Sequence, residues 1–323
     1  MFAVALVLAA PTPSASGAAF DAFKATFGKS YASREEPLRV AHFEQTLREI
    51  DAVNRAALGW TAGVNEFADL SWAEFKRDVL MLPQNCSATR RAGRTTHASR
   101  LAAPPAIDWR DYGALNAVKN QRSCGSCWTF STSGCLESHV FLKTGHMPNI
   151  SEQQLVDCAG AFHNNGCNGG LPSQAFEYII SAGGIDSEAA YPYTAKTGDT
   201  CLYKAGAAGV VAKVRDVVNI TEKDEAELEY AVGTIGPVSI AFEVAEDFRL
   251  YKSGVYDGVC HDDSQHVNHA VVAVGYGATE DGAPYWTVRN SWGVGWGERG
   301  HFRIARGANK CGLADCASYP IVA

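Results

Sequence analysis

The sequence predicts an α+β protein of two lobes, with helices in its first part and strands after them. Apolar residues recur at helical spacing in several segments before residue 235, whereas short β-rich runs separated by glycines dominate after it. Of the 323 residues, 46% are hydrophobic and 20% are charged, which excludes a disordered chain. The net charge of -7 argues against a nucleic-acid partner, because a phosphate-binding surface would oppose the protein's own field.

The N-terminus predicts a secretory signal peptide over residues 1–18. Residues 2–10 form an apolar run, and small residues follow it. A buried N-terminal strand or helix is the alternative. The run is too short to cross a bilayer, and no other stretch is long and apolar enough for a membrane helix. Ten cysteines and three N-x-Ser/Thr glycosylation sequons, at Asn85, Asn149 and Asn219, agree with an oxidising route.

The next segment, residues 19–103, is predicted to be helical and separate from the body. Residues 35–58 contain no glycine, and Pro37 falls where a first helical turn tolerates it. Ser71 and Glu74 form a capping box that begins a shorter helix. Residues 79–107 contain four arginines and no acidic residue, which is typical of an exposed, cleavable linker.

The charges of the two parts differ in sign. Residues 21–101 hold 12 basic and 10 acidic residues, whereas the remainder holds 16 basic and 25 acidic residues. The two parts are therefore expected to attract each other weakly.

The body, residues 104–323, is predicted to begin with helices and to continue with strands. The helices are expected at residues 126–141, 151–156, 172–181 and 222–234. The strands are expected at residues 238–242, 270–274, 285–288 and 302–304. Helices first and strands later indicate an α+β body in two lobes.

A reactive cysteine is expected at Cys127. It lies at the predicted start of a helix, where the helix dipole stabilises a thiolate and makes a nucleophile from a thiol of pKa about 8.5. A redox pair and half of a zinc site are two alternatives, because Cys124 and Cys127 have the spacing for both. Neither alternative accounts for the residues downstream.

Two later residues complete a catalytic pattern with this cysteine. His269 lies at the mouth of an apolar strand, about 140 residues further on, and an imidazole there can protonate a leaving amine. Asn290 follows another strand, and its amide oxygen can orient the imidazole while Trp292 shields that hydrogen bond from water. The order Cys, His, Asn predicts nucleophilic catalysis by a thiol.

With these residues the chain resembles the papain family of cysteine peptidases. The upstream segment also resembles the propeptide of that family, in a helix pattern and a Gly-x-Asn-x-Phe-x-Asp strand at Glu35, Arg39, Phe43, Ile50, Asn54, Gly63, Asn65, Phe67 and Asp69. The resemblance implies a helical left lobe, a β-barrel-like right lobe and an active-site cleft between them, preceded by a helical inhibitory propeptide. It implies hydrolysis of peptide bonds through a thioester acyl-enzyme, without a cofactor or metal.

The same resemblance implies the roles of individual residues. Cys127 would be the nucleophile, His269 the acid/base and Asn290 its orienting residue. Gln121 would donate to the oxyanion together with the backbone N–H of Cys127. The implied substrate-binding residues are Gly169, Gly170, Trp292 and Thr89.

A narrower resemblance is to a branch of the family that retains a short piece of its propeptide, the mini-chain. Residues 83–89, Pro-Gln-Asn-Cys-Ser-Ala-Thr, carry this resemblance, and the mini-chain is expected at residues 82–89. The branch implies an enzyme that is mainly an aminopeptidase with some endopeptidase activity. The alternatives are a plain endopeptidase, if the segment around Cys86 is lost, a non-catalytic peptide-binding or inhibitory homologue, and a thiol oxidoreductase.

Cysteine counting alone leaves the disulfides open, because eight cysteines allow on the order of 100 pairings. The resemblance implies the pairs Cys124 with Cys167, Cys158 with Cys201, Cys260 with Cys311, and Cys86 with Cys316. Cys135 is left over and is expected to be a small buried hydrophobe. The expected partners are peptide and protein substrates and the chain's own propeptide. We expect a monomer that follows the secretory pathway to a lysosome or vacuole, or out of the cell.

Overall fold

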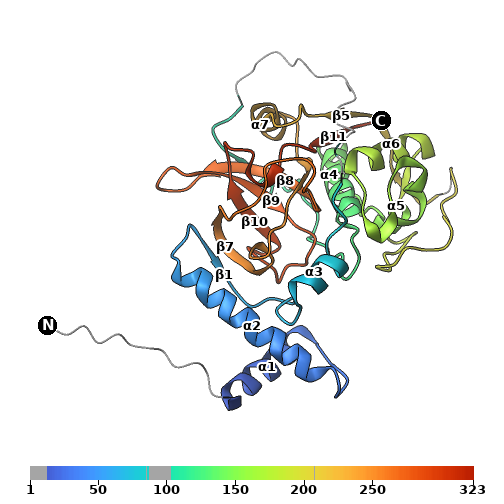
Figure 1. The fold of residues 1–323 in the computed structure, drawn as a ribbon. Coiled ribbons are helices and arrows are strands. Elements are labelled where there is room, and N and C mark those ends of the chain that lie inside the picture. The colour runs from blue at the N-terminus through green and yellow to red at the C-terminus, as the bar shows by residue number, and fades with distance from the viewer. Residues whose placement is uncertain (1–12, 85, 87–102, 207) are drawn as a thin grey trace.

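The computed structural model describes residues 13–84, 86, 103–206 and 208–323 (Figure 1). The α-helices are α1 (Pro13–Phe27), α2 (Glu36–Arg55), α3 (Trp72–Asp78), α4 (Cys127–Thr144), α5 (Glu152–Cys158), α6 (Pro172–Ala182) and α7 (Glu225–Thr234). The strands are β1 (Trp60–Ala62), β2 (Ile107–Asp108), β3 (Ile185–Asp186), β4 (Val210–Ala212), β5 (Val214–Asn219), β6 (Val238–Phe242), β7 (Tyr251–Tyr256), β8 (His269–Ala278), β9 (Pro284–Arg289), β10 (His301–Ala305) and β11 (Ser318–Val322).

Most strands belong to one large sheet. Its hydrogen-bonded order is β1-β7-β10-β9-β8-β6-β11-β5, and β2 pairs with β8 beside this path. Neighbouring strands are antiparallel except β7 and β10, which are parallel. In the described part of the chain the two ends of the path, β1 and β5, do not pair with each other. The lobe that the resemblance led us to expect as barrel-like is therefore an open sheet.

The two predicted lobes are present, and α4 lies between them. Figure 1 shows α4, α5 and α6 gathered on one side and the strands β7 to β10 on the other. Every residue of α4 from Cys127 to Val140 is buried, because α5 and α6 pack on the helix from one side and β8 and β11 from the other. A helix in this position brings its first residue to the boundary of the two lobes.

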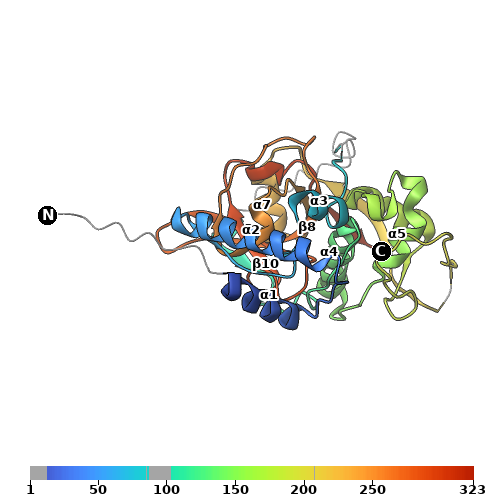
Figure 2. The ribbon, with the colours of Figure 1, turned by 60° about the horizontal axis from the view of Figure 1, so that its bottom comes forward.

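The predicted propeptide packs on the sheet lobe. In both ribbon views α1 lies beside α2 (Figure 2), and Figure 1 shows α2 next to β1, the strand that pairs with β7. Phe20, Phe23, Phe43 and Ala68 form a small core of their own, so α1 and α2 are held to each other by aromatic packing. Glu49 on α2 and Arg249 of the body, 2.6 Å apart, form the ion pair that joins the two parts among the described residues.

Several element boundaries differ from the sequence predictions for local reasons. The helix expected from residue 222 begins at Glu225, because the carboxylate of Asp224 accepts the N–H of Glu227 and caps it. The strand expected at residues 270–274 begins at His269 and continues to Ala278. The capping box of Ser71 and Glu74 begins α3 as predicted.

The predicted signal peptide overlaps a helix. Residues 1–12 lie outside the described part of the chain, and α1 begins at Pro13, within the predicted segment 1–18. Phe20 and Phe23 of the same helix are buried in the propeptide core. Among the described residues, no helix combines the length and apolar character needed to cross a bilayer.

Candidate active site

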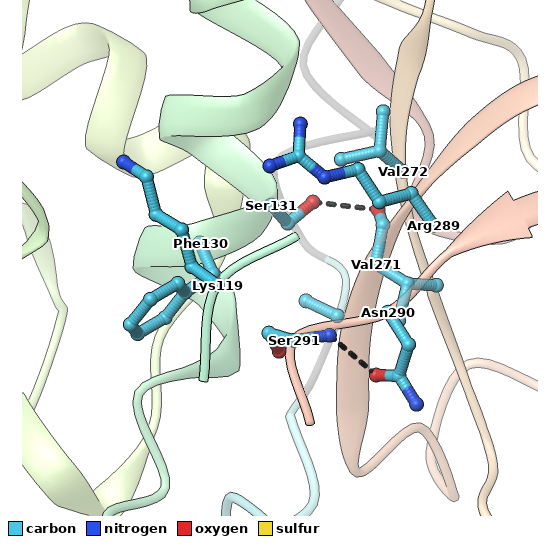
Figure 3. A pocket seen from close by; sticks show the side chains of 9 residues that line it. Lys119, Phe130, Ser131, Val271, Val272, Arg289, Asn290 and Ser291 are labelled. Carbon is cyan, nitrogen blue, oxygen red and sulfur yellow. Dashed lines mark hydrogen bonds between the residues drawn. The ribbon is translucent and has the colours of Figure 1, made fainter. Parts of the chain in front are cut away.

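The thiol of Cys127 lies at the first residue of α4 and is completely buried. The backbone N–H of Ala270 donates a hydrogen bond to its Sγ over 3.3 Å. One turn further along α4, the hydroxyl of Ser131 donates to the carbonyl of Val271 over 2.6 Å (Figure 3). These two bonds fix α4 against β8, the strand that begins with His269.

The imidazole of His269 is held by an amide and covered by an indole. Its Nε2–H donates to Oδ1 of Asn290 over 2.8 Å, which leaves Nδ1 as the basic nitrogen of the neutral ring. Nδ1 is buried and has no hydrogen-bond partner among the described residues. The Trp292 ring stacks on the imidazole with centroids 4.6 Å apart, and it is only 1% exposed. Water is therefore kept from the bond between His269 and Asn290.

Gln121 lies beside this group with both ends of its amide bonded. Its Oε1 accepts a hydrogen bond from the hydroxyl of Ser291 over 2.7 Å. Its Nε2 donates to the carbonyls of Cys124 at 2.9 Å and Val79 at 2.8 Å. Val79 belongs to the predicted propeptide. Its carbonyl therefore accepts the hydrogen bond that, by the resemblance, Gln121 would donate to the oxyanion of a substrate. Sequence reasoning gave Ser291 no role, although it stands between Asn290 and Trp292.

Propeptide residues 79–84 run past the thiol. The N–H of Met81 donates to Asn268, that of Leu82 to Asn168 and that of Gln84 to Val267, each over 3.1 Å. The segment therefore bonds to the main chain of both lobes. Sequence reasoning predicted an inhibitory propeptide and did not identify the residues that fill the site. The signal available was the apolar run from Val79 to Leu82 in an otherwise polar linker.

The two glycines predicted to bind substrate lie in different surroundings. A Cβ on Gly169 would meet Cβ of Met81 at 2.9 Å, so Gly169 faces the propeptide segment. A Cβ on Gly170 would meet the ring of Trp128 at 2.8 Å, so Gly170 packs into the helical lobe. Gly169 is therefore the one that an extended chain in this place contacts closely.

Burial determines the protonation of the thiol and the imidazole in this state. Desolvation raises the pKa of Cys127 to about 12, although the Ala270 N–H works in the opposite direction. Desolvation also lowers the pKa of His269 to about 4, against the hydrogen bond to Asn290. Between these two values both groups are neutral. The start of α4 is predicted to lower the pKa of Cys127, but burial under the propeptide raises this pKa by more.

A small cavity of about 10 Å³ lies behind these residues, with room for about one water molecule (Figure 3). Its lining includes Lys119 and Arg289, which stand close to Gln121 and Asn290 in the sequence. Lys119 Nζ lies 2.9 Å from a carboxylate oxygen of Glu137, and Arg289 donates to a backbone carbonyl over 2.6 Å. Lys119 is thus ion-paired, whereas Nη1 of the buried Arg289 has no hydrogen-bond partner among the described residues.

The cysteines pair as the resemblance implies. The disulfides are Cys86–Cys316, Cys124–Cys167, Cys158–Cys201 and Cys260–Cys311. Cys127 and Cys135 are free and buried. Because Cys124 is bonded to Cys167, it is not available to Cys127 as a redox or zinc partner. The described residues also contain no group of three or more His, Cys, Asp or Glu that could hold a metal ion.

The remaining predicted residues are only partly described. Thr89 and Asn85 lie outside the described part of the chain. Asn149 is exposed in the loop before α5, as an attached glycan requires. Asn219 lies on β5 and is 9% exposed, so its side chain offers little access in the folded protein. Glycosylation of these three residues stays a prediction.

A thiol at a helix start, an oriented imidazole and an amide donor, all beneath a covering N-terminal segment, define a cysteine peptidase in its proenzyme form. Residues 103–321 match the family described as papain family cysteine protease, and residues 20–75 match the cathepsin propeptide inhibitor domain (I29). The chain therefore belongs to the papain family of cysteine peptidases.

Individual relatives cover almost the whole chain. Thiol protease aleurain of Arabidopsis thaliana is 53% identical over 306 residues, which cover 94% of this chain and 84% of that protein. Pro-cathepsin H of Bos taurus is 50% identical over 305 residues, which cover 94% and 89%. The narrower resemblance in residues 83–89 is likewise to cathepsin H. Among solved structures, digestive procathepsin L 3 of Tenebrio molitor superposes with a TM-score of 0.86 at 36% identity, covering 94% of this chain and 98% of that one.

Proposed function

We propose that this papain-family peptidase, once its propeptide is removed, acts mainly as an aminopeptidase with some endopeptidase activity in an acidic compartment of the secretory pathway. The observation that carries the proposal is the disulfide between Cys86 and Cys316, which ties propeptide residues to the body. Cleavage on both sides of residues 82–89 would leave this short segment attached while the rest of the propeptide departs. The expected signal peptide and the disulfides support the secretory route.

The proposed reaction uses the residues gathered at the start of α4. With the propeptide gone, Cys127 transfers its proton to Nδ1 of His269, and the thiolate attacks the scissile carbonyl carbon. The carbonyl oxygen, which becomes negatively charged, accepts hydrogen bonds from Nε2 of Gln121, which then no longer donates to Val79, and from the backbone N–H of Cys127.

The same histidine completes the reaction in two steps. His269 gives its proton to the leaving amine, the C–N bond breaks and a thioester with Cys127 remains. His269 then takes a proton from water, the resulting hydroxide attacks the thioester carbon, and the thiol is regenerated as the acid product leaves.

Asn290→Ala is expected to lower kcat by about 100-fold and to change KM little. The amide oxygen orients the imidazole and does not bind substrate, so its loss affects the chemical step through misalignment. Steady-state kinetics on a peptide amide measure both constants. An increase in KM with kcat unchanged would contradict the orienting role.

The direction in which the propeptide runs through the site supports the aminopeptidase preference. Phe67 packs on Trp292 with ring centroids 5.4 Å apart, Val79 reaches Gln121, and Gln84 and Cys86 lie further along. The segment that would be retained is therefore at the opposite end of the site from Trp292. Gly169, where a Cβ would meet Nε2 of Gln84 at 2.7 Å, lies on this side.

A retained segment ending at Thr89 would place a carboxylate there, beyond the described residues. A carboxylate about 4 Å from the α-ammonium of a substrate gives roughly 4 kcal/mol of attraction at an effective dielectric near 20, before desolvation and screening. Half of that value corresponds to about a thirty-fold preference for a free over a blocked N-terminus.

Cys86→Ser is expected to remove this preference by releasing the segment. The measurement is kcat/KM for matched substrates with free and acetylated N-termini, and the ratio is expected to fall by about thirty-fold. Cys135→Ser is the matched control, because this buried cysteine is not bonded to the segment. If mass spectrometry shows the segment lost and the ratio unchanged, the retained segment does not set the preference for a free N-terminus and the proposal is wrong.

A further inference from the structure

β1 of the propeptide adds a strand to the edge of the catalytic sheet. Trp60 pairs with Gly254 and Thr61 with Ser253 in antiparallel register. The N–H of Val255 donates to the carbonyl of Gly59 over 2.9 Å, so β7 also bonds to the residue before β1. The sheet path ends at β1, and removal of the propeptide therefore leaves β7 as an edge strand with free main-chain groups.

The indole of Trp60 lies in an aromatic pocket of the body, the tyrosine seat, which Tyr251 and Tyr256 form. The indole is 2% exposed, and its ring centroid lies 5.0 Å from that of Tyr256 and 6.4 Å from that of Tyr251. The hydroxyl of Tyr256 donates to Asp247, and that of Tyr251 donates to the carbonyl of Gly254, each over 2.7 Å. Neither bond involves the propeptide, so we expect both to persist when Trp60 leaves.

The seat recognises an aromatic surface and not the indole N–H. Nε1 of Trp60 is buried without a hydrogen-bond partner among the described residues. A phenyl ring would therefore lose contact area but no hydrogen bond. At position 63, three residues after Trp60, a glycine avoids the side chain of Lys252, which a Cβ there would meet at 2.7 Å.

Gly254 has no side chain and so leaves room for the backbone of the added strand. Its φ of +99° lies in the left-handed region that favours glycine. The three heavy atoms nearest to a Cβ placed there all belong to Gly59 and Trp60 of the propeptide, with Cα of Trp60 at 2.6 Å. None of these three nearest atoms belongs to the catalytic body, so a side chain at position 254 would meet the incoming backbone first, and it would also strain a backbone whose φ favours glycine.

From these contacts we propose that in the processed enzyme β7 is a docking site for an extended strand of a protein substrate, with an aromatic residue opposite Gly254 and a glycine three residues after it. The proposal rests on the proposed function in requiring that the propeptide is removed. Main-chain bonds to β7 would supply affinity and the tyrosine seat would supply selectivity, as in other cases of strand addition. Strands β10 and β9 separate β7 from β8, so a docked strand leaves the cleft free and raises the local concentration of substrate.

A labelled peptide tests the site directly. The probe is residues 58–66, acetylated and amidated, with fluorescence anisotropy measured on processed enzyme whose Cys127 is alkylated so that the probe is not cut. We expect saturable binding, about tenfold weaker binding for the Trp60→Ala peptide and binding within about threefold for Trp60→Phe. In active enzyme, saturating probe is expected to leave hydrolysis of a small amide unchanged.

A second experiment measures the effect on catalysis. The same segment is fused to the C-terminus of a protein substrate, and kcat/KM is expected to exceed that of the Trp60→Ala fusion by about tenfold. Gly254→Ala in the enzyme is expected to remove the difference, with small-amide hydrolysis as the check that the variant is folded.

The outcomes separate this proposal from the proposed function. Three results would each overturn the docking site. The first is equal binding of the probe and its Trp60→Ala form, and the second is competition of the probe with the small amide. The third is a dimer of the processed enzyme joined through β7. If the processed enzyme hydrolyses amides but does not bind the probe, the docking site is wrong and the proposed function is unaffected. A processed enzyme inactive on every amide overturns the proposed function.

Discussion

Cys127→Ala is expected to abolish hydrolysis of every peptide and amide substrate, with a loss of kcat of at least about 10⁴-fold. The thiol supplies the nucleophile of the proposed reaction, and the other free cysteine, Cys135, is buried next to Pro237, to whose carbonyl it donates over 3.2 Å. The measurement is turnover of a fluorogenic amide by enzyme that has been processed with a separate peptidase. Cys135→Ala is the matched control and is expected to stay active.

The same variant tests whether the chain removes its own propeptide. Cys127→Ala proenzyme is expected to stay intact at acidic pH, whereas the Cys135→Ala proenzyme loses its propeptide there. Retention of the four disulfides and of the far-ultraviolet circular dichroism of the wild type shows that the variant is folded. Measurable amide turnover by pure Cys127→Ala enzyme would contradict the assignment of the nucleophile. A wild-type chain without activity after processing would instead favour the non-catalytic alternative.

Alkylation of Cys127 by iodoacetamide at pH 6 is expected to be at least about 10³-fold faster in the processed enzyme than in the proenzyme. Burial raises the pKa of this thiol to about 12 under the propeptide, so at pH 6 almost none of it is thiolate. Removal of the covering segment admits water, and the start of α4 and a protonated His269 then favour the thiolate. A thiolate of lower pKa is a weaker nucleophile, but the increase in the fraction of thiolate has the larger effect on the alkylation rate.

The alkylation rate of Cys127 is expected to depend on pH differently in the proenzyme and in the processed enzyme. In the proenzyme the alkylation rate is expected to rise with pH throughout the range below about 12, because the thiol loses its proton only as pH approaches that value. In the processed enzyme the rate is expected to reach its plateau in the acidic range. Mass spectrometry assigns the label, and Cys135, whose pKa burial also raises to about 12, is an internal control that stays unlabelled in both forms. Equal rates for Cys127 in the two forms would show that the propeptide does not govern the state of the thiol.

Local signals in the sequence were sufficient for the elements that carry the site. The sequence predicted helices at residues 126–141 and 151–156, where α4 and α5 lie, because helical periodicity depends on residues a few positions apart. The pairing of Asn290 with His269 followed from residue chemistry and chain order. The four disulfides came from family resemblance, since spacing alone left on the order of 100 pairings open.

The sequence by itself therefore determined the α+β class, the family and the residues on which the chemistry is proposed to depend. Only the tertiary structure decided how β1, β7, β5 and β11 extend an open sheet, since short strands of mixed polarity form by pairing with residues far away in the chain. It also decided that Val79 bonds to Gln121, and that burial reverses the shift a helix start would give Cys127. Burial and long-range pairing are properties of the folded chain, so no local pattern contains them.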